Sequence, residues 1–374
     1  MRKFVILAVC LLAYGCASPA IQRTVVFAED SDSCHFYRIP AMCLDKDGAI
    51  VAVADRRYEN IADLGYRKTS IDIGTRRSTD GGRTWSPQTF IARGDTSKWL
   101  GFGYGDASLT LLPSGKILCL MACGNGPKGF RRGLKQTTVC ESEDGGITWS
   151  EPRIVPFPDT LHSAFITSGK GIVDADGDIL LAACVLEHDY PDPMPVPWPI
   201  ESHLFYSKDE GQTWTLQGEK TFDLADESKL ALLPDGRLVI SCRRPSYGPR
   251  GLNTAIKGED GIWHWEGQRL TEGLEANPCN GDILALDHGV LLHSYIREKT
   301  ARKGLTLAVS TDGGTSWRDI LTLQEGAAAY TTMVRMKNGD IGVLYEDGTA
   351  SPDDGYDIVF ARIPRRALRR ALRP

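Results

Sequence analysis

Short apolar runs, each preceded by a polar turn that contains glycine, recur along this 374-residue chain. Residues 50–54 and 238–242 are two such runs, and their length and composition are typical of short, buried strands. We call the turns together with their flanking residues glycine hairpins. Their glycines are 50 to 67 residues apart and are Gly48, Gly115, Gly177, Gly236, Gly289 and Gly339. The chain therefore predicts a series of short strands joined by tight turns.

A second turn pattern, Ser-x-Asp-x-Gly-x-Thr-Trp, alternates with the glycine hairpins. We call it the Asp-turn, and it occurs at residues 78–85, 142–149 and 207–214, with a near-copy at 310–317 and a decayed version around 257–263. Asp close to Gly favours a tight hairpin turn, and the Ser and Asp side chains can hydrogen-bond the backbone of their own turn. The Trp can pack the turn onto the body of the protein.

The order of the two patterns predicts the fold. In the first three units, the Ser of an Asp-turn follows the hairpin glycine by 27 to 30 residues. Two hairpins per unit give about four strands, which is the size of a propeller blade. Six units over residues 24–361 therefore predict an all-β, six-bladed β-propeller. A β-sandwich is the alternative, but it gives no reason for the ordered alternation.

Composition narrows the class of protein further. Hydrophobic residues make up 42% of the chain and charged residues 24%, which is ordinary for a globular protein. The formal charge of −5 argues against a nucleic-acid partner. None of the ten cysteines forms a Cys-x-x-Cys pair, which disfavours a structural zinc site.

Both ends of the chain carry arginine or lysine. Arg2 and Lys3 precede an apolar stretch that is too short to span a bilayer, so residues 1–16 are predicted to be an export signal. Residues 13–16 resemble a bacterial lipoprotein cleavage site, which would place a lipid on Cys16 and attach the protein to a membrane at the cell surface or in the periplasm. Simple secretion is the alternative. Residues 362–374 contain six arginines and are predicted to be a basic tail, either a surface helix or a frayed end.

One motif points to chemistry. Arg38, in Tyr37-Arg38-Ile39-Pro40, lies in an apolar strand, where an arginine is costly unless it faces a partner. This motif, followed by repeated Asp-turns, resembles the bacterial exo-α-sialidases (neuraminidases) over about residues 24–361. The resemblance implies an enzyme that releases terminal sialic acids from glycans, glycoproteins or glycolipids without a metal or organic cofactor. Propellers with Asp-turns also serve as binding scaffolds, so the site must be judged separately.

The resemblance implies three arginines that bind the carboxylate of the sugar, and these are Arg38, Arg243 and Arg302. Arginine suits this task because its planar guanidinium can bind a carboxylate through two parallel hydrogen bonds. Arg244 is the rival of Arg243. Neighbours on a strand point to opposite faces, so only one of the two can face the site.

The resemblance also implies the reacting groups. Tyr330 matches the nucleophile and Glu227 its base, an arrangement known as an exception among glycosidases. Tyr345 is the rival of Tyr330, but it precedes Glu346, which we expect to hold Arg38.

Asp63 matches the general acid and base, with Glu59 and Asp72 as alternatives. Arg57 and Asp106 match contacts to the substituents of the sugar ring.

Two loops are candidates for substrate specificity, an aromatic cluster of Trp99, Phe102 and Tyr104 and a Pro-rich segment at 191–199. Each could stack on a sugar or simply pack within its loop. The principal hypothesis is a retaining exo-α-sialidase. The alternatives are a non-catalytic sialic-acid-binding propeller, a hydrolase of a related nonulosonic acid, and an intramolecular trans-sialidase that releases an anhydro product.

Overall fold

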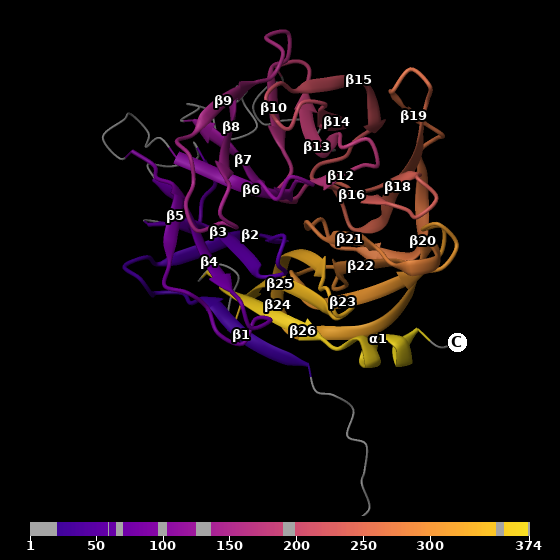
Figure 1. Cartoon of the computed structure of the whole chain (residues 1–374). Helices are drawn as coiled ribbons and strands as arrows, with labels where there is room; N and C mark the ends of the chain where they lie inside the picture. Colours follow the sequence, from indigo (N-terminus) through magenta and orange to yellow (C-terminus); the bar gives the residue numbers. More distant parts are fainter. Residues whose placement is uncertain are drawn as a thin grey trace, which may run out of the picture.

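Antiparallel sheets arranged in sequence order around a common centre make up this all-β, propeller-like protein (Figure 1). The computed structural model describes residues 21–58, 60–64, 70–95, 103–124, 136–189, 199–348 and 355–372. Most neighbouring strands of each sheet pair antiparallel, whereas β11 pairs with β6 in parallel. Between neighbouring inner strands, β2 contacts β6 and β24, and β16 contacts β21.

Within these ranges the strands form five sheets. The first two contain β2 (Phe36–Leu44), β3 (Ile50–Arg57), β4 (Ile71–Ser78) and β5 (Thr89–Ala92), and then β6 (Gly103–Leu111), β7 (Ile117–Gly124), β8 (Gln136–Ser142), β9 (Arg153–Pro156) and β11 (Gly169–Lys170). The third contains β10 (Ser163–Ile166), β12 (Ile172–Val173), β13 (Ile179–Leu186), β14 (Glu201–Ser207) and β15 (Thr215–Phe222). The fourth contains β16 (Ser228–Leu232), β17 (Leu238–Cys242), β18 (Gly248–Lys257), β19 (Trp263–Trp265) and β20 (Arg269–Ala276).

The fifth sheet has seven strands and closes the ring. It contains β21 (Asp282–Ala285), β22 (Leu291–Ile296), β23 (Lys303–Ser310), β24 (Arg318–Arg335), β25 (Ile341–Gly348), β26 (Asp357–Ile363) and β1 (Gln22–Phe27), with the 3-10 turn η1 (Asp287–Gly289) between β21 and β22. The long strand β24 pairs with β23 up to Ala327 and with β25 from Ala327 onward. The N-terminal strand β1 pairs with β26, so the two ends of the chain meet in one sheet. Five hydrogen-bonded sheets do not by themselves establish six blades, and that count stays a prediction.

The Asp-turns hold their shape through local hydrogen bonds. Asp144 accepts bonds from the backbone N–H groups of Ile147 (3.1 Å) and Thr148 (2.9 Å) and from the Thr148 hydroxyl (2.6 Å). The Gly146 N–H donates to the Ser142 hydroxyl at 2.8 Å. Gly146 has a φ of 85°, and a Cβ there would lie 2.9 Å from a Val51 methyl group. Glycine is therefore required both by the left-handed backbone and by contact with the preceding sheet.

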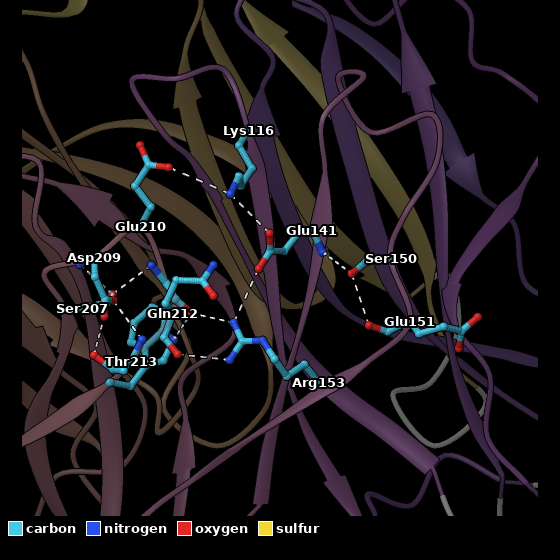
Figure 2. A network of polar contacts seen from close by, with 12 residues as sticks. Lys116, Glu141, Ser150, Glu151, Arg153, Ser207, Asp209, Glu210, Gln212 and Thr213 are labelled. Carbon is cyan, nitrogen blue, oxygen red and sulfur yellow. Dashed lines mark hydrogen bonds and ion pairs between the residues drawn. The ribbon is translucent and has the colours of Figure 1, made fainter.

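Cations of one sheet bind the Asp-turn of the next. Figure 2 shows Arg153, at the start of β9, donating to the carbonyl oxygen of Gln212 (3.2 Å). Arg153 also donates to the carbonyl oxygen of Gly211 at 2.7 Å. Beside it, Lys116 pairs with Glu141 at 3.3 Å. The same contact recurs where Arg77 reaches Gly145 (2.9 Å), Lys208 reaches Gly261 (3.1 Å) and Arg269 reaches Gly313 (3.3 Å). The Asp-turns thus connect adjacent sheets at the outer side of the ring.

The C-terminal segment is partly strand and partly helix. Arg362 and Ile363 complete β26, and the helix α1 (Arg365–Ala371) follows them, packed through the buried side chain of Leu368. Of the two predicted forms of the basic tail, the helix is therefore the one observed for these residues. The predicted export signal with Cys16, the acid/base alternative Glu59, the aromatic residues Trp99 and Phe102, and residues 191–198 of the Pro-rich segment lie outside the described residues. Within the described ranges, no helix is long and apolar enough to cross a bilayer.

Candidate active site

Glu346 is the central anchor of the candidate site. This fully buried residue of β25 accepts a hydrogen bond from Arg38 Nε at 2.7 Å. It also accepts the backbone N–H groups of Ile39 (2.7 Å) and Tyr330 (3.0 Å). Burial alone would lower the pKa of Arg38, but the Glu346 carboxylate raises that pKa above its ordinary value. One carboxylate therefore fixes both the Arg38 guanidinium and the backbone that carries Tyr330.

Irregular backbone directs three of the predicted side chains. The strand pairing shifts register between Arg38 and Ala41, between Gly105 and Ser108, and between Ala328 and Thr331. Ile39 and Asp106 have positive φ angles of 55° and 54°, which non-glycine residues seldom adopt. Bulges of this kind turn side chains away from the regular alternation of a strand. The predicted residues Arg38, Asp106 and Tyr330 lie at these three places.

Tyr330, Glu227 and Arg243 form a buried hydrogen-bonded triad. The Tyr330 hydroxyl donates to Glu227 Oε2 at 2.7 Å and accepts from Arg243 Nη1 at 2.9 Å. Arg243 also donates directly to Glu227. Burial raises the pKa of Tyr330 well above its usual value, the Glu227 carboxylate raises it further, and Arg243 and Arg302 oppose the change. The phenol is thus neutral at rest and stands next to a base that can take its proton.

Two further guanidinium groups lie over the Tyr330 ring. The Cζ atoms of Arg38 and Arg302 are 5.6 Å and 5.3 Å from its centroid, and Arg38 is also 5.1 Å from the centroid of Tyr356. Arg302 directly precedes β23, and its side chain forms no ion pair with a carboxylate of the described part of the chain. Arg38, Arg243 and Arg302 therefore gather around one phenol, and the third is available to an anionic ligand.

The structure separates the rival residues from this group. Arg244, which follows β17, donates to the Asp223 carbonyl at 3.0 Å and lies over Phe222. The Tyr345 hydroxyl bonds Asp347 at 3.3 Å. Within the described ranges, the side chain of neither rival is hydrogen-bonded to Glu227 or Glu346.

A second cluster centres on Arg57. Its Nη1 donates to Asp63 at 2.8 Å and its Nη2 to Asp55 at 2.7 Å, while the other oxygen of Asp55 accepts the Asp106 N–H at 3.1 Å. Asp55 and Arg57 are fully buried, whereas the Asp63 side chain is 39% exposed. A partly exposed carboxyl held by a buried arginine can reach a ligand that binds above it.

Electrostatic interactions join the two clusters. Burial raises the pKa of Asp55 to about 6 and raises that of Asp106 well above its usual value, and Asp55, Glu227 and Asp63 raise the Asp106 pKa further. The Asp63 carboxylate also raises the pKa of Arg38. The predicted residues of both clusters are thus neighbours in one site, although their roles stay predictions. Asp72, the alternative to Asp63, is bound elsewhere, by the Tyr58 hydroxyl at 2.5 Å and the Gly94 N–H at 2.8 Å.

Comparison with known proteins gives the family. The chain matches the BNR repeat-like domain family over residues 62–343. It is 30% identical over 339 residues to a sialidase of Micromonospora viridifaciens, covering 84% of this chain and 50% of that protein. It is 27% identical over 368 residues to a sialidase of Clostridium perfringens, covering 86% of this chain and 89% of the relative. The chain belongs to the bacterial sialidase family with BNR repeats.

Solved structures agree with this family at the level of the fold. The Hadza microbial sialidase Hz136 superimposes with a TM-score of 0.75 at 25% identity and covers 91% of this chain and 68% of its own. Trypanosoma rangeli sialidase in complex with sialic acid gives a TM-score of 0.75 at 19% identity, over 95% of this chain and 60% of its own. This sialidase-family chain therefore spans half to nine-tenths of the length of these relatives.

Sequence reasoning assigned no role to two residues of this sialidase-family site. Asp55 holds Arg57 and the strained backbone of Asp106, and Tyr356 packs against Arg38. Asp55 could have been found, because it lies two residues before Arg57 in one strand and so shares its face. Tyr356 gave no such signal, because it lies outside the strands, directly before β26. Among the described residues, no group of three His, Cys, Asp or Glu side chains could hold a metal ion. All eight cysteines of these ranges are buried.

Proposed function

We propose that this protein is a retaining exo-α-sialidase that hydrolyses terminal sialic acids of glycans, glycoproteins or glycolipids. One observation carries the proposal: the neutral, buried phenol of Tyr330 donates to Glu227 at 2.7 Å and is surrounded by three guanidinium groups. The named sialidases of the comparisons support the same assignment.

The three arginines suit a substrate that carries a carboxylate on its anomeric carbon. Arg38 and Arg243 are held by Glu346 and Glu227, so little entropy is lost when they bind an anion. Arg302 has no carboxylate partner within the described ranges and would gain one from the substrate. A neutral phenol is also the better nucleophile here, because a carboxylate would be repelled by the charge of the substrate.

Catalysis would proceed by two displacements. In the first, Tyr330 Oη bonds the anomeric carbon and gives its proton to Glu227, while the glycosidic bond breaks and the leaving oxygen takes a proton from Asp63. In the second, water bonds the anomeric carbon and gives a proton to Asp63, while the bond to Tyr330 breaks and Glu227 returns the proton to the phenol. Each displacement inverts the anomeric carbon, so the two in succession retain its configuration.

Further parts of the proposal concern organisation and location. We propose six blades, with β24 counted in two of them, because its two halves pair with β23 and β25. Arg57 and Asp106 would contact the ring substituents of the sugar. Export, with or without a lipid on Cys16, would bring the enzyme to extracellular glycans.

Hydrolysis of 4-methylumbelliferyl sialic acid tests the proposal. We expect fluorescence release, α-sialic acid as the first product by NMR, and a covalent adduct on Tyr330 after treatment with 2,3-difluorosialic acid. A product lighter by one water would support the intramolecular trans-sialidase instead. Binding of sialic acid by folded protein without any turnover would contradict an enzyme altogether.

A further inference from the structure

Lys229 is a buried cation that the proposed mechanism does not use. It lies in β16, two residues after Glu227. The backbone of Glu227 continues the ladder of this strand, since its carbonyl accepts the Arg243 N–H at 3.1 Å. Side chains two positions apart in an extended strand leave it on the same side. Lys229 and Glu227 therefore face the same side of β16.

The Lys229 ammonium lies next to β11. The side chain is 2% exposed, and its Nζ has no hydrogen-bond partner among the described residues. A Cβ on Gly169 of β11 would lie 2.5 Å from this Nζ and 3.6 Å from the Thr332 hydroxyl of β24. Because Gly169 has no side chain, it leaves room for the Lys229 ammonium.

The carboxyl groups of Asp282, Glu227 and Asp106 and the ammonium of Lys170 act on Lys229 electrostatically. Asp282 is already bound by Lys170 Nζ at 2.8 Å and by the Met333 N–H at 2.6 Å. Asp106 is buried, and its raised pKa favours the neutral form. Glu227 is thus the neighbouring carboxylate whose charge would change during the reaction.

The charge on Glu227 would alternate during the catalytic cycle. In the free enzyme Glu227 is an anion, and in the glycosyl-enzyme it holds the proton of Tyr330 and is neutral. Negative charge then resides on Asp63 instead. A fixed positive charge beside Glu227 favours the free enzyme over the intermediate, because opposite charges attract strongly in a buried site.

We propose that Lys229 is a positioning residue that speeds the breakdown of the glycosyl-tyrosine intermediate by favouring the anionic form of Glu227. This inference rests on the proposed function. In the breakdown step, water bonds the anomeric carbon and the Tyr330 oxygen leaves with the bonding electron pair. The proton that this oxygen takes comes from Glu227, which regains its charge next to the Lys229 ammonium, and the proton of the water goes to Asp63.

The inference predicts a dependence on pH. Burial lowers the pKa of Lys229 to about 8, with Lys170 acting in the same direction and Asp282 and Glu227 opposing. The ammonium is therefore charged below about pH 8 and neutral above it. Breakdown of the intermediate should be fast below this pH and should slow as the pH rises through it.

The test measures reactivation of enzyme labelled with 2,3-difluorosialic acid. We expect Lys229→Met to reactivate about tenfold more slowly at pH 6.5 than wild type and to lose the slowing above about pH 8, whereas Lys229→Arg stays close to wild type. A tenfold change corresponds to about 1.4 kcal/mol. The melting temperature of Lys229→Met should equal or exceed that of wild type, because an unpaired buried charge is replaced by an apolar side chain of similar size.

Equal reactivation rates of wild type and Lys229→Met would overturn the inference while leaving the proposed function intact. Equally slow reactivation of Lys229→Arg would also overturn it, because shape rather than charge would then matter. Wild type that forms no adduct on Tyr330 would overturn the proposed function and this inference together. If Lys229→Met fails to fold, the wild-type profile decides, and a reactivation rate that does not slow between pH 6.5 and 9.5 contradicts the proposal.

Discussion

The Asp-turns at the outer side and the candidate site near the centre use the same residue types in opposite ways. Asp144 of an Asp-turn is bound by residues three and four positions away, and these hydrogen bonds lower its pKa to about 2 although burial opposes them. Asp106 of the site is buried beside other carboxylates, and its pKa is raised. Glu346 binds Arg38 across 308 positions of sequence.

This difference separates stability from chemistry. Exposed carboxylates that accept local hydrogen bonds are stabilised as anions and hold a turn in shape. Buried carboxylates near charges from distant parts of the sequence have shifted pKa values, and such shifts are typical of catalytic groups. Substitutions in the Asp-turns should therefore affect mainly unfolding, whereas substitutions at the site should affect mainly rate.

Tyr330→Phe should give the largest effect on rate. It removes the proposed nucleophile, and we expect kcat/KM to fall by roughly 10³-fold or more while the melting temperature changes by only a few degrees. Glu227 and Arg243 remain paired in this variant, so no buried charge is left alone. Sialoside hydrolysis and thermal melting measure the two quantities. Retention of most of the activity would exclude Tyr330 as the nucleophile.

Glu346→Gln should lower both the stability of the fold and the catalytic rate. It leaves the Arg38 charge without its partner and loosens the Tyr330 backbone, so we expect a loss of about 3–5 kcal/mol in the free energy of unfolding and about 10²-fold in kcat/KM. Asp340→Asn is the matched control, because Asp340 also binds an arginine Nε at 2.7 Å, that of Arg362, but nearer the surface. Equal losses of kcat/KM in the two variants would contradict the distinction between the candidate site and positions nearer the surface.

Asp144→Asn should lower stability and leave the rate of the folded enzyme unchanged. We expect a loss of about 1–2 kcal/mol at neutral pH, because the carboxylate accepts several hydrogen bonds. Its pKa is lowered to about 2 in the folded state, so this contribution is present above the ordinary carboxyl pKa and is lost as pH falls through about 2. Urea unfolding at pH 7, 4 and 2.5 should show the gap to wild type shrinking only at the acidic end. A gap that is the same at all three pH values would contradict the role of the charge.

Arg153→Gln should have the smallest effect. It removes the contacts to the carbonyl oxygens of Gly211 and Gln212, the second of which Figure 2 shows, and Arg153 is partly exposed, so we expect a loss of about 1 kcal/mol or less and no change in kcat. Urea unfolding together with sialoside hydrolysis checks both. A clear loss of activity would show that the outer contacts between sheets also control the site.

Much of the fold followed from local sequence. The glycine hairpins and Asp-turns indicated an all-β protein of short strands, because their backbone shapes depend on residues within four positions of one another. The resemblance then named Arg38, Glu227, Arg243, Arg302 and Tyr330, which the structure brings together. Asp63, Arg57 and Asp106 join the same site through Asp55, which the sequence alone did not single out.

By itself, the sequence determined the turns, the strands and their order, since each depends on nearby residues. Only the tertiary structure decided which side chains meet. It separated Arg243 from Arg244 and Tyr330 from Tyr345, it assigned Glu346 to three partners, and it showed that β24 runs through two groups of strands. The physical reason is that these contacts join residues up to 308 positions apart, which come together only when the early strand β2 packs beside the late strands β24 and β25.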